Sequence, residues 1–155
     1  MKISTRGRYA LRFLLDLAEH ACDGFTPMKI VAERQGISLK YLEQLVPILG
    51  RNGLIEGQHG KGGGYRLLVA PSDVTVGSVL RMTEGELVPV ACLECGSKPC
   101  ERAEICLTLP MWKACQQLMN SFFDGITLDN LLHGNIRILL ADSQGQEGAS
   151  GQESA

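Results

Sequence analysis

Apolar residues recur at helical spacing near the start of the chain. They fall on one helix face between residues 5 and 21, and the members of this stripe are Ala10, Phe13, Leu14, Leu17, Ala18 and Ala21. A stripe with this period predicts an amphipathic helix over 5–21. Asp23 and Gly24 follow the stripe and predict the end of the helix.

A second, shorter helix is predicted from Thr26 to about Gln35. Thr26 is typical of an N-cap, and Pro27 is typical of a first helical position. The apolar residues of this helix are Ile30, Val31 and Ala32. Gly36 then predicts a tight turn.

A third helix is predicted to begin at Ser38, a second N-cap candidate. Its apolar stripe consists of Leu42, Leu45, Val46 and Leu49. Pro47 lies inside the helix and predicts either a bend or an early end. Two short helices joined by a glycine turn are the sequence form of a helix-turn-helix.

Residues 54–69 predict two short strands around a glycine-rich loop, which is the pattern of a β-wing. His59, Lys61 and Arg66 place positive or ionisable groups at its tip and flank. A nucleotide-binding glycine loop would need a Lys-Ser/Thr ending and a following helix, and this segment has neither. We therefore favour the wing.

The second half of the chain predicts three more helical segments. A short helix is expected over 76–83, and Thr127 is expected to cap a final turn over 127–133. Between them, residues 107–123 carry an apolar stripe of Trp112, Cys115, Leu118, Met119, Phe122 and Phe123. Because the preceding helices already supply a core, this stripe predicts contact with a second copy.

These elements predict a mainly α protein with a small β-hairpin. We expect a winged helix-turn-helix DNA-binding domain over 1–85, a cysteine-rich loop over 86–106 and a dimerisation helix region over 107–134. Residues 135–155 are expected to be a disordered tail. After Asp142 the tail contains only serine, glutamine, glycine, glutamate and alanine, and such a segment cannot form an apolar core.

Four cysteines fall within fifteen residues: Cys92, Cys95, Cys100 and Cys106. A core does not require four thiols in a loop, whereas thiolates at this spacing can converge on one soft metal centre. Structural zinc also takes four thiolates, usually as two close pairs, and a thiol–disulfide switch needs only two. The residues alone leave these alternatives open.

Charge and hydropathy bound the setting of the protein. Residues 1–70 carry a net charge of +4 and residues 71–155 carry −6. This asymmetry favours a protein whose N-terminal part binds a polyanion such as a nucleic acid. No stretch approaches the ~20 apolar residues of a membrane span, and early charged residues interrupt any signal peptide. We expect a cytoplasmic protein with no membrane partner. Its three histidines lie in no recognised catalytic motif, so we expect no enzyme activity.

Several segments occur together in a specific order and spacing. They are Ser4-Thr5-Arg6-Gly7-Arg8-Tyr9-Ala10, Glu33-Arg34-Gln35-Gly36-Ile37-Ser38, Tyr41-Leu42-Glu43-Gln44-Leu45, Gly62-Gly63-Gly64-Tyr65, the cysteines 92, 100 and 106, and Trp112. With them the chain, from Met1 to about His133, resembles the iron–sulfur cluster regulators of the IscR type. This bacterial family of winged-helix repressors also includes nitric-oxide and iron sensors.

The resemblance implies a homodimer that places the helix from residue 38 in the major groove of double-stranded DNA. The positions at which family members touch DNA are here Ser38, Lys40, Tyr41, Glu43 and Gln44. Such side chains suit phosphates and base edges. The family's wing often carries a minor-groove arginine, and here that position is His59, with Lys61 two residues on. Arg6 and Arg8 are candidate phosphate contacts.

For the cofactor, the resemblance implies an iron–sulfur cluster on Cys92, Cys100 and Cys106. The histidine that some relatives use as fourth ligand is here Leu109, and the carboxylate that others use is Arg8. Cys95 is therefore the candidate fourth ligand, with an external ligand as the alternative. A [2Fe–2S] cluster is favoured slightly over [4Fe–4S].

Other functions fit parts of the same pattern. A zinc- or thiol-redox-controlled DNA-binding regulator would use the same cysteines. A module that binds iron–sulfur assembly proteins rather than DNA is another alternative, in which the third helix would not bind nucleic acid. Assembly proteins are also candidate partners of a regulator that carries a cluster.

Overall fold

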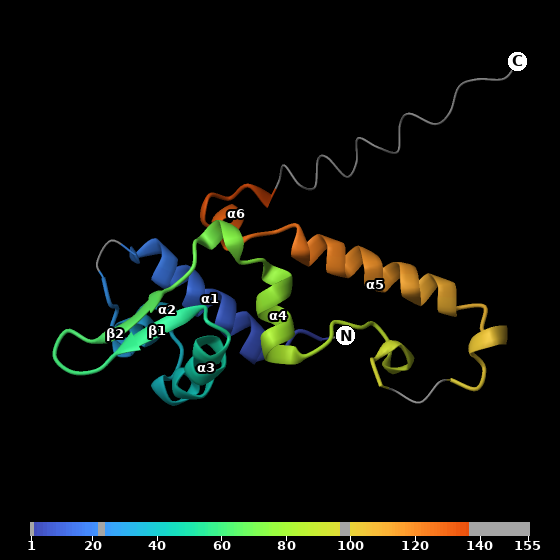
Figure 1. Ribbon diagram of the computed structural model, residues 1–155, viewed down its shortest axis with the longest axis horizontal. Coiled ribbons are helices and arrows are strands. Elements are labelled where there is room, and N and C mark those ends of the chain that lie inside the picture. The colour runs from blue at the N-terminus through green and yellow to red at the C-terminus, as the bar shows by residue number, and fades with distance from the viewer. Residues whose placement is uncertain (1, 22–23, 97–99, 137–155) are drawn as a thin grey trace, which may run out of the picture.

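The helices and the hairpin are arranged as a compact body with one projecting arm (Figure 1). The computed structural model describes residues 2–21, 24–96 and 100–136. Its elements are α1 (Thr5–Glu19), α2 (Met28–Gln35), α3 (Leu39–Arg51), β1 (Ile55–Gln58), β2 (Gly64–Leu67), α4 (Val76–Glu84), α5 (Leu109–Asp124) and α6 (Leu128–Leu132). The predicted mainly α fold with a small hairpin is confirmed. Most of the predicted tail, residues 137–155, lies outside the described residues.

The helix-turn-helix forms as the local signals predict. Gly36 adopts a left-handed conformation with a φ of 61° and ends α2. Ser38 caps α3, since its side-chain oxygen accepts a hydrogen bond from the backbone N–H of Tyr41 at 3.3 Å. Helix α3 continues through Pro47 to Arg51. Of the two alternatives predicted for Pro47, an early end of the helix is therefore wrong.

The start of α2 differs from the prediction. Pro27 occupies the N-cap and the helix begins at Met28, so Thr26 is not the cap. Thr26 is instead buried and pairs with Tyr65, donating its N–H to the Tyr65 carbonyl at 2.9 Å and accepting from the Tyr65 N–H at 2.8 Å. The partner that overrides the local signal is distant in sequence. Ile30, predicted in the apolar set of α2, is 40% exposed.

The main core lies between α1, α2 and α3. The predicted stripes supply its largest fully buried side chains, among them Phe13, Leu14, Leu17, Leu42, Leu45 and Leu49. Burying each such side chain contributes about 1.5–3 kcal/mol to folding. The stripe of α3 is therefore turned inward, and this leaves its opposite face to solvent.

The wing is an antiparallel hairpin in which Ile55 pairs with Leu67 and Gln58 with Gly64. Gly64 has a φ of 156°, and a Cβ atom there would overlap the carbonyl of Thr26. Only glycine permits this close approach of two backbones. Gly64 thus joins the wing to the segment before α2.

We expect Gly64→Ala to destabilise the fold by at least about 1–3 kcal/mol, because alanine adds backbone strain and displaces the Thr26 pairing. Gly62→Ala is the matched control. Gly62 also has a positive φ, 79°, but a Cβ there would meet no atom within 4 Å. Urea unfolding should show the larger loss for Gly64→Ala, and equal losses would contradict the role of the close approach.

The C-terminal segments return to the body. The backbone of Thr75 pairs with that of Thr127, and Leu128 of α6 is fully buried in the main core. Thr127 and Asn130 form a reciprocal capping box at the start of α6, which confirms the predicted cap.

Helix α5 forms the projecting arm and has no buried residue (Figure 1). Its C-terminal half is attached to α4, since Arg81 donates hydrogen bonds to Asn120 at 3.1 Å and to Asp124. Met111, Leu118 and Phe122, which recur on one side of the helix, are 53%, 73% and 45% exposed. Among the helices of the described ranges, none is long and apolar enough to span a membrane.

Candidate DNA-binding face and cysteine loop

The outer face of α3 presents a group of polar side chains. Lys40, Glu43 and Gln44 are exposed, as is the capping residue Ser38. Their spacing of three and four residues places Lys40, Glu43 and Gln44 together on the helix surface. The face can donate to phosphates, accept from base amines and bond a base edge at two points.

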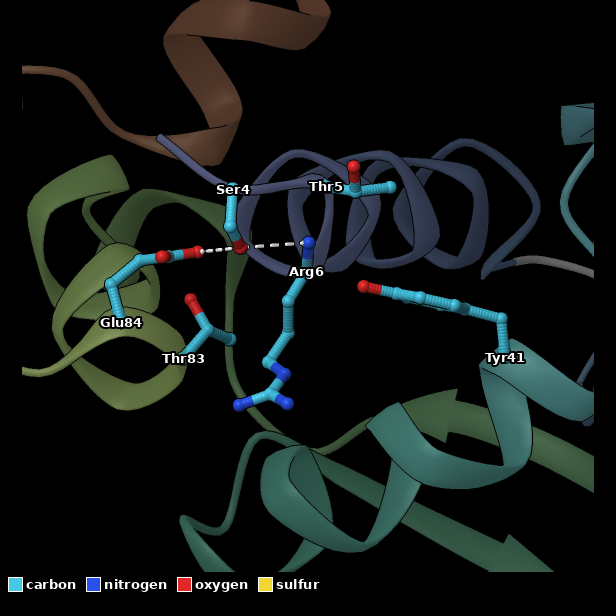
Figure 2. Close-up of a pocket in the computed structure, with 6 residues that line it drawn as sticks. All are labelled: Ser4, Thr5, Arg6, Tyr41, Thr83 and Glu84. Atoms are coloured by element: carbon cyan, nitrogen blue, oxygen red, sulfur yellow. Dashed lines mark hydrogen bonds between the residues drawn. The ribbon is translucent and has the colours of Figure 1, made fainter. Parts of the chain in front are cut away.

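Tyr41 differs from its neighbours because it is half-buried. Its ring packs edge-on against Tyr9 of α1 with a centroid distance of 5.3 Å, and the Arg12 guanidinium lies 5.5 Å from the Tyr9 ring centroid. The ring therefore has a packing role. Its hydroxyl points into the space beside Arg6, where it can reach a ligand (Figure 2).

A cleft of about 550 Å³ separates the start of α1 from the start of α3. Its lining residues are Ser4, Thr5, Arg6, Tyr41, Thr83 and Glu84 (Figure 2). Arg6 and Arg8 are both exposed at this end of α1. Arg6 thus lies on the same side of the molecule as Tyr41 at the start of α3.

The wing carries its exposed ionisable residues at the tip. His59 and Lys61 are both exposed there. Arg66, on the flank, is held in place because it forms an ion pair with Glu56 and stacks 4.6 Å from the centroid of the Phe25 ring. Of the wing cations, Lys61 is thus the one best placed at the tip to meet a polyanion.

Three of the four clustered cysteines share one cavity. Cys92, Cys100 and Cys106 line a space of about 220 Å³ whose other walls are Leu93, Ala103, Leu109 and Lys113. Leu109, which the sequence analysis excluded as a fourth ligand, lines this cavity and offers no donor atom. Lys113, one turn further along α5, brings a positive charge that suits an assembly of thiolates.

Cys95 lies elsewhere. The chain leaves the 3-10 turn Ala91–Leu93 in extended conformation at Glu94. The N–H of Cys95 then donates to a carboxylate oxygen of Glu86 at 2.8 Å. Cys95 lines a cavity of about 370 Å³ with Glu84, Glu86 and Glu94. It also lines a second cavity, of about 250 Å³, with Arg81 of α4 and Asn120 of α5.

Cys106 is set apart by its hydrogen bonds. The Thr108 hydroxyl lies 3.4 Å from its sulfur, and this side-chain bond, followed by backbone bonds from Thr108 and Leu109, lowers the pKa of the Cys106 thiol. The thiolate form is the one that binds metals and attacks electrophiles. These bonds therefore favour the form of Cys106 that can ligate a metal.

The cysteine side chains that share the cavity do not form a compact metal-binding site. Within residues 2–21, 24–96 and 100–136, no three histidine, cysteine or carboxylate side chains converge closely enough to hold one metal ion. Ligation by the three cysteines would require the cavity to contract. The donor set fits a thiolate-bound iron centre, since soft sulfur ligands surround one largely apolar space.

Comparison with known proteins decides the family. Residues 3–134 match the model of the Rrf2 family, described as an iron-dependent transcriptional regulator. The chain belongs to the Rrf2 family. The predicted resemblance to IscR-type regulators is thereby confirmed, and the DNA-binding winged helix follows from the family and its fold.

Individual relatives agree with the Rrf2 assignment. The HTH-type transcriptional regulator IscR of Aliivibrio salmonicida is 38% identical over 149 residues, covering 96% of this chain and 88% of the relative. Among solved structures, T. potens IscR is 31% identical with a TM-score of 0.67, covering 99% of this chain and 94% of that one. CymR, the global cysteine regulator of B. subtilis, is 34% identical with a TM-score of 0.70, covering 86% and 97%. These relatives are regulators rather than enzymes, as expected for this chain.

One central feature of this Rrf2 protein was not predicted. Asp16 of α1 is 1% exposed, and its carboxylate accepts hydrogen bonds from Arg34 at 2.5 and 3.1 Å and from Gln35 at 2.9 Å. This network joins α1 to the last turn of α2, immediately before the helix-turn-helix turn. The sequence feature that could have indicated this buried carboxylate is the position of Asp16, three residues after Phe13 and next to the apolar stripe of α1.

Proposed function

We propose that this Rrf2 regulator is a homodimer that binds double-stranded operator DNA and whose affinity is set by an iron–sulfur cluster. The observation that carries the proposal is the shared cavity of Cys92, Cys100 and Cys106 in a chain whose α3 presents a polar, exposed face. The proposed setting is the cytoplasm, where thiols remain reduced.

The DNA contacts follow from the exposed faces. Ser38, Lys40, Glu43 and Gln44 would enter the major groove, with Tyr41 contributing its hydroxyl. Arg6, Arg8 and Lys61 would contact phosphates, and His59 would lie at the wing tip near the minor groove. The division into a DNA-binding domain over 1–85, a cluster loop over 86–106 and a dimerisation region over 107–134 remains part of the proposal.

Helix α5 supports dimerisation. Its exposed apolar residues Met111, Leu118 and Phe122 recur at spacings of seven and four, which forms a seam suited to a second copy. Two copies would present two recognition helices, as paired DNA half-sites require.

The cysteine loop would hold the cluster through the thiolates of Cys92, Cys100 and Cys106. A bound cluster supplies covalent iron–sulfur links between segments that are otherwise separate in the loop. The position of Cys95 favours a fourth ligand from outside the protein's cysteines, unless the loop turns Cys95 into the shared cavity. We favour [2Fe–2S] slightly over [4Fe–4S]. Iron–sulfur assembly proteins are proposed partners, as the source of the cluster.

The deciding experiment is an absorption spectrum with iron and sulfide assays on protein purified without oxygen. Broad visible absorption with matching iron and acid-labile sulfide supports the proposal. Zinc without sulfide would establish a structural metal instead, and a metal-free protein with oxidisable thiols would establish a redox switch. A salt-sensitive gel shift with promoter fragments separates a DNA-binding regulator from a module that binds only assembly proteins.

We expect Gln44→Ala to weaken binding to the preferred duplex by ~1–3 kcal/mol, because a glutamine at this position can bond adenine at two points. Lys40→Ala is the comparison, since losing a phosphate contact should weaken all duplexes alike and reduce the salt slope by about 1. Fluorescence anisotropy on preferred and scrambled duplexes measures both. An equal loss on both duplexes for Gln44→Ala contradicts base recognition.

A further inference from the structure

The carboxylate of Glu84 links the end of α4 to the start of α1. Its Oε1 accepts a hydrogen bond from the Ser4 hydroxyl at 2.5 Å and another from the Gly7 N–H at 2.9 Å. The Ser4 hydroxyl oxygen in turn accepts from the N–H of Arg6 at 3.0 Å. Figure 2 shows this chain of bonds running from Glu84 to the backbone of Arg6, a proposed DNA contact.

The two helices meet closely at this point. Gly7 is buried, and a Cβ atom there would lie 2.7 Å from the Glu84 Oε1 and 2.9 Å from a methyl carbon of Leu80. Glycine at position 7 thus allows the first turn of α1 to rest directly on the last turn of α4. A movement of α4 would have to carry this turn with it.

The other side of Glu84 faces the cysteine loop. Glu84 and Glu86 line the same cavity as Cys95, and Glu86 accepts the hydrogen bond from the Cys95 N–H. Asn120 of α5 donates to the carbonyl of Leu87 at 3.4 Å, so the same short segment is also attached to α5. Residues 84–87 therefore connect the cysteine loop, α5 and the DNA-facing end of α1.

We propose that Glu84 is a positioning residue that carries the state of the cysteine loop to Arg6 and Arg8. Closing the loop on a cluster would pull on the Glu86–Cys95 bond, and Glu84 would transmit the shift to the first turn of α1. The inference rests on the proposed function. It adds the path by which the cysteine loop would act on the DNA-binding end of α1.

The charge of Glu84 has a separate effect from its geometry. A carboxylate at a helix N-terminus is stabilised by the aligned peptide dipoles. It also occupies the α1 N–H of Gly7, which leaves phosphate binding at this end to the side chains of Arg6 and Arg8. Glutamine at position 84 would keep Oε1 as an acceptor for both bonds and remove only the charge, whereas alanine would remove both.

The test measures the coupling ratio, defined as the Kd for DNA of cluster-loaded protein divided by that of cluster-free protein. The probe is a duplex that the full-length wild-type protein enriches from a random-sequence library. Couplings of this kind typically amount to 5–150-fold. We expect Glu84→Ala to bring the ratio to within about twofold of one, and Glu84→Gln to keep the wild-type ratio while binding DNA equally or more tightly.

Two further variants keep the test independent of folding. Glu86→Ala should also reduce the ratio, and Glu84→Ala with Glu86→Ala should reduce it no further, because the two contacts act in series. Glu19→Ala removes an exposed charge from the other end of α1 and should leave the ratio unchanged. Amide exchange without DNA should show that residues 5–8 respond to cluster loading in the wild type and not in Glu84→Ala.

The outcomes separate this inference from the proposed function. A wild-type protein without a cluster, or with a coupling ratio of one, overturns the proposed function and the inference with it. A coupled wild type together with a folded Glu84→Ala variant that keeps the full ratio overturns the Glu84 path alone. If each single variant reduces the coupling ratio only in part and the double variant shows the sum of the two reductions, the two contacts do not act in series and the path is also wrong.

Discussion

Replacing Cys100 by alanine is expected to abolish cluster binding and to leave the fold intact. Cys100 is exposed and lines the shared cavity with Cys92 and Cys106, so its loss leaves two of three thiolates. It contributes to neither buried cluster, and the free energy of unfolding of the cluster-free protein should change by less than about 0.5 kcal/mol. Visible absorption, iron and sulfide content, and urea unfolding measure the two effects.

Cys95→Ala is the matched control, because it removes an exposed thiol from the same loop. Since Cys95 faces the carboxylates of a different cavity, we expect this variant to retain the cluster. Loss of absorption in both variants would assign Cys95 as the fourth ligand and show that the loop turns on binding. An unfolded Cys100→Ala protein would point to structural zinc.

Replacing Asp16 by alanine is expected to destabilise the fold by about 3 kcal/mol. Removing one partner of a buried ion pair costs ~3–5 kcal/mol, because the other charge is left without compensation. Arg34 is 32% exposed and can turn toward water, which places the expected loss at the lower end. The Gln35 amide also loses its acceptor.

Urea unfolding at one fixed protein concentration measures this loss, since the stability of a dimer depends on concentration. Glu19→Ala is the control on the same helix, one turn later and exposed, and it should change stability by less than about 0.5 kcal/mol. A loss of under 1 kcal/mol for Asp16→Ala would show that the network does not stabilise the helix-turn-helix. Weakened DNA binding is expected to accompany the full loss, since Asp16 anchors the end of α2.

Local sequence signals were sufficient where the structure depends on neighbours along the chain. The period of Leu42, Leu45 and Leu49 fixes which face of α3 is buried, and hence which face is free for DNA. The Ser38 cap, the Gly36 turn and the Thr127 capping box depend on hydrogen bonds within a few residues. Their geometry is determined once the residue types are known.

The same signals failed where a distant group competes. Thr26 has the form of an N-cap but pairs with Tyr65, almost forty residues later. Arg66 has the form of a free wing cation but is held by Glu56 and Phe25. Tyr65 and Phe25 lie about forty residues from their partners, and no local spacing along the chain specifies these contacts.

By itself, the sequence determined the family, the winged helix-turn-helix, the exposed side of α3 and the position of the cysteine cluster along the chain. The tertiary structure decided which groups meet. It brought Cys92, Cys100 and Cys106 to one cavity, separated Cys95 from them, buried Asp16 against Arg34 and set Glu84 on the first turn of α1. Periodicity and capping report short-range order, whereas these contacts depend on how helices far apart in the chain pack together.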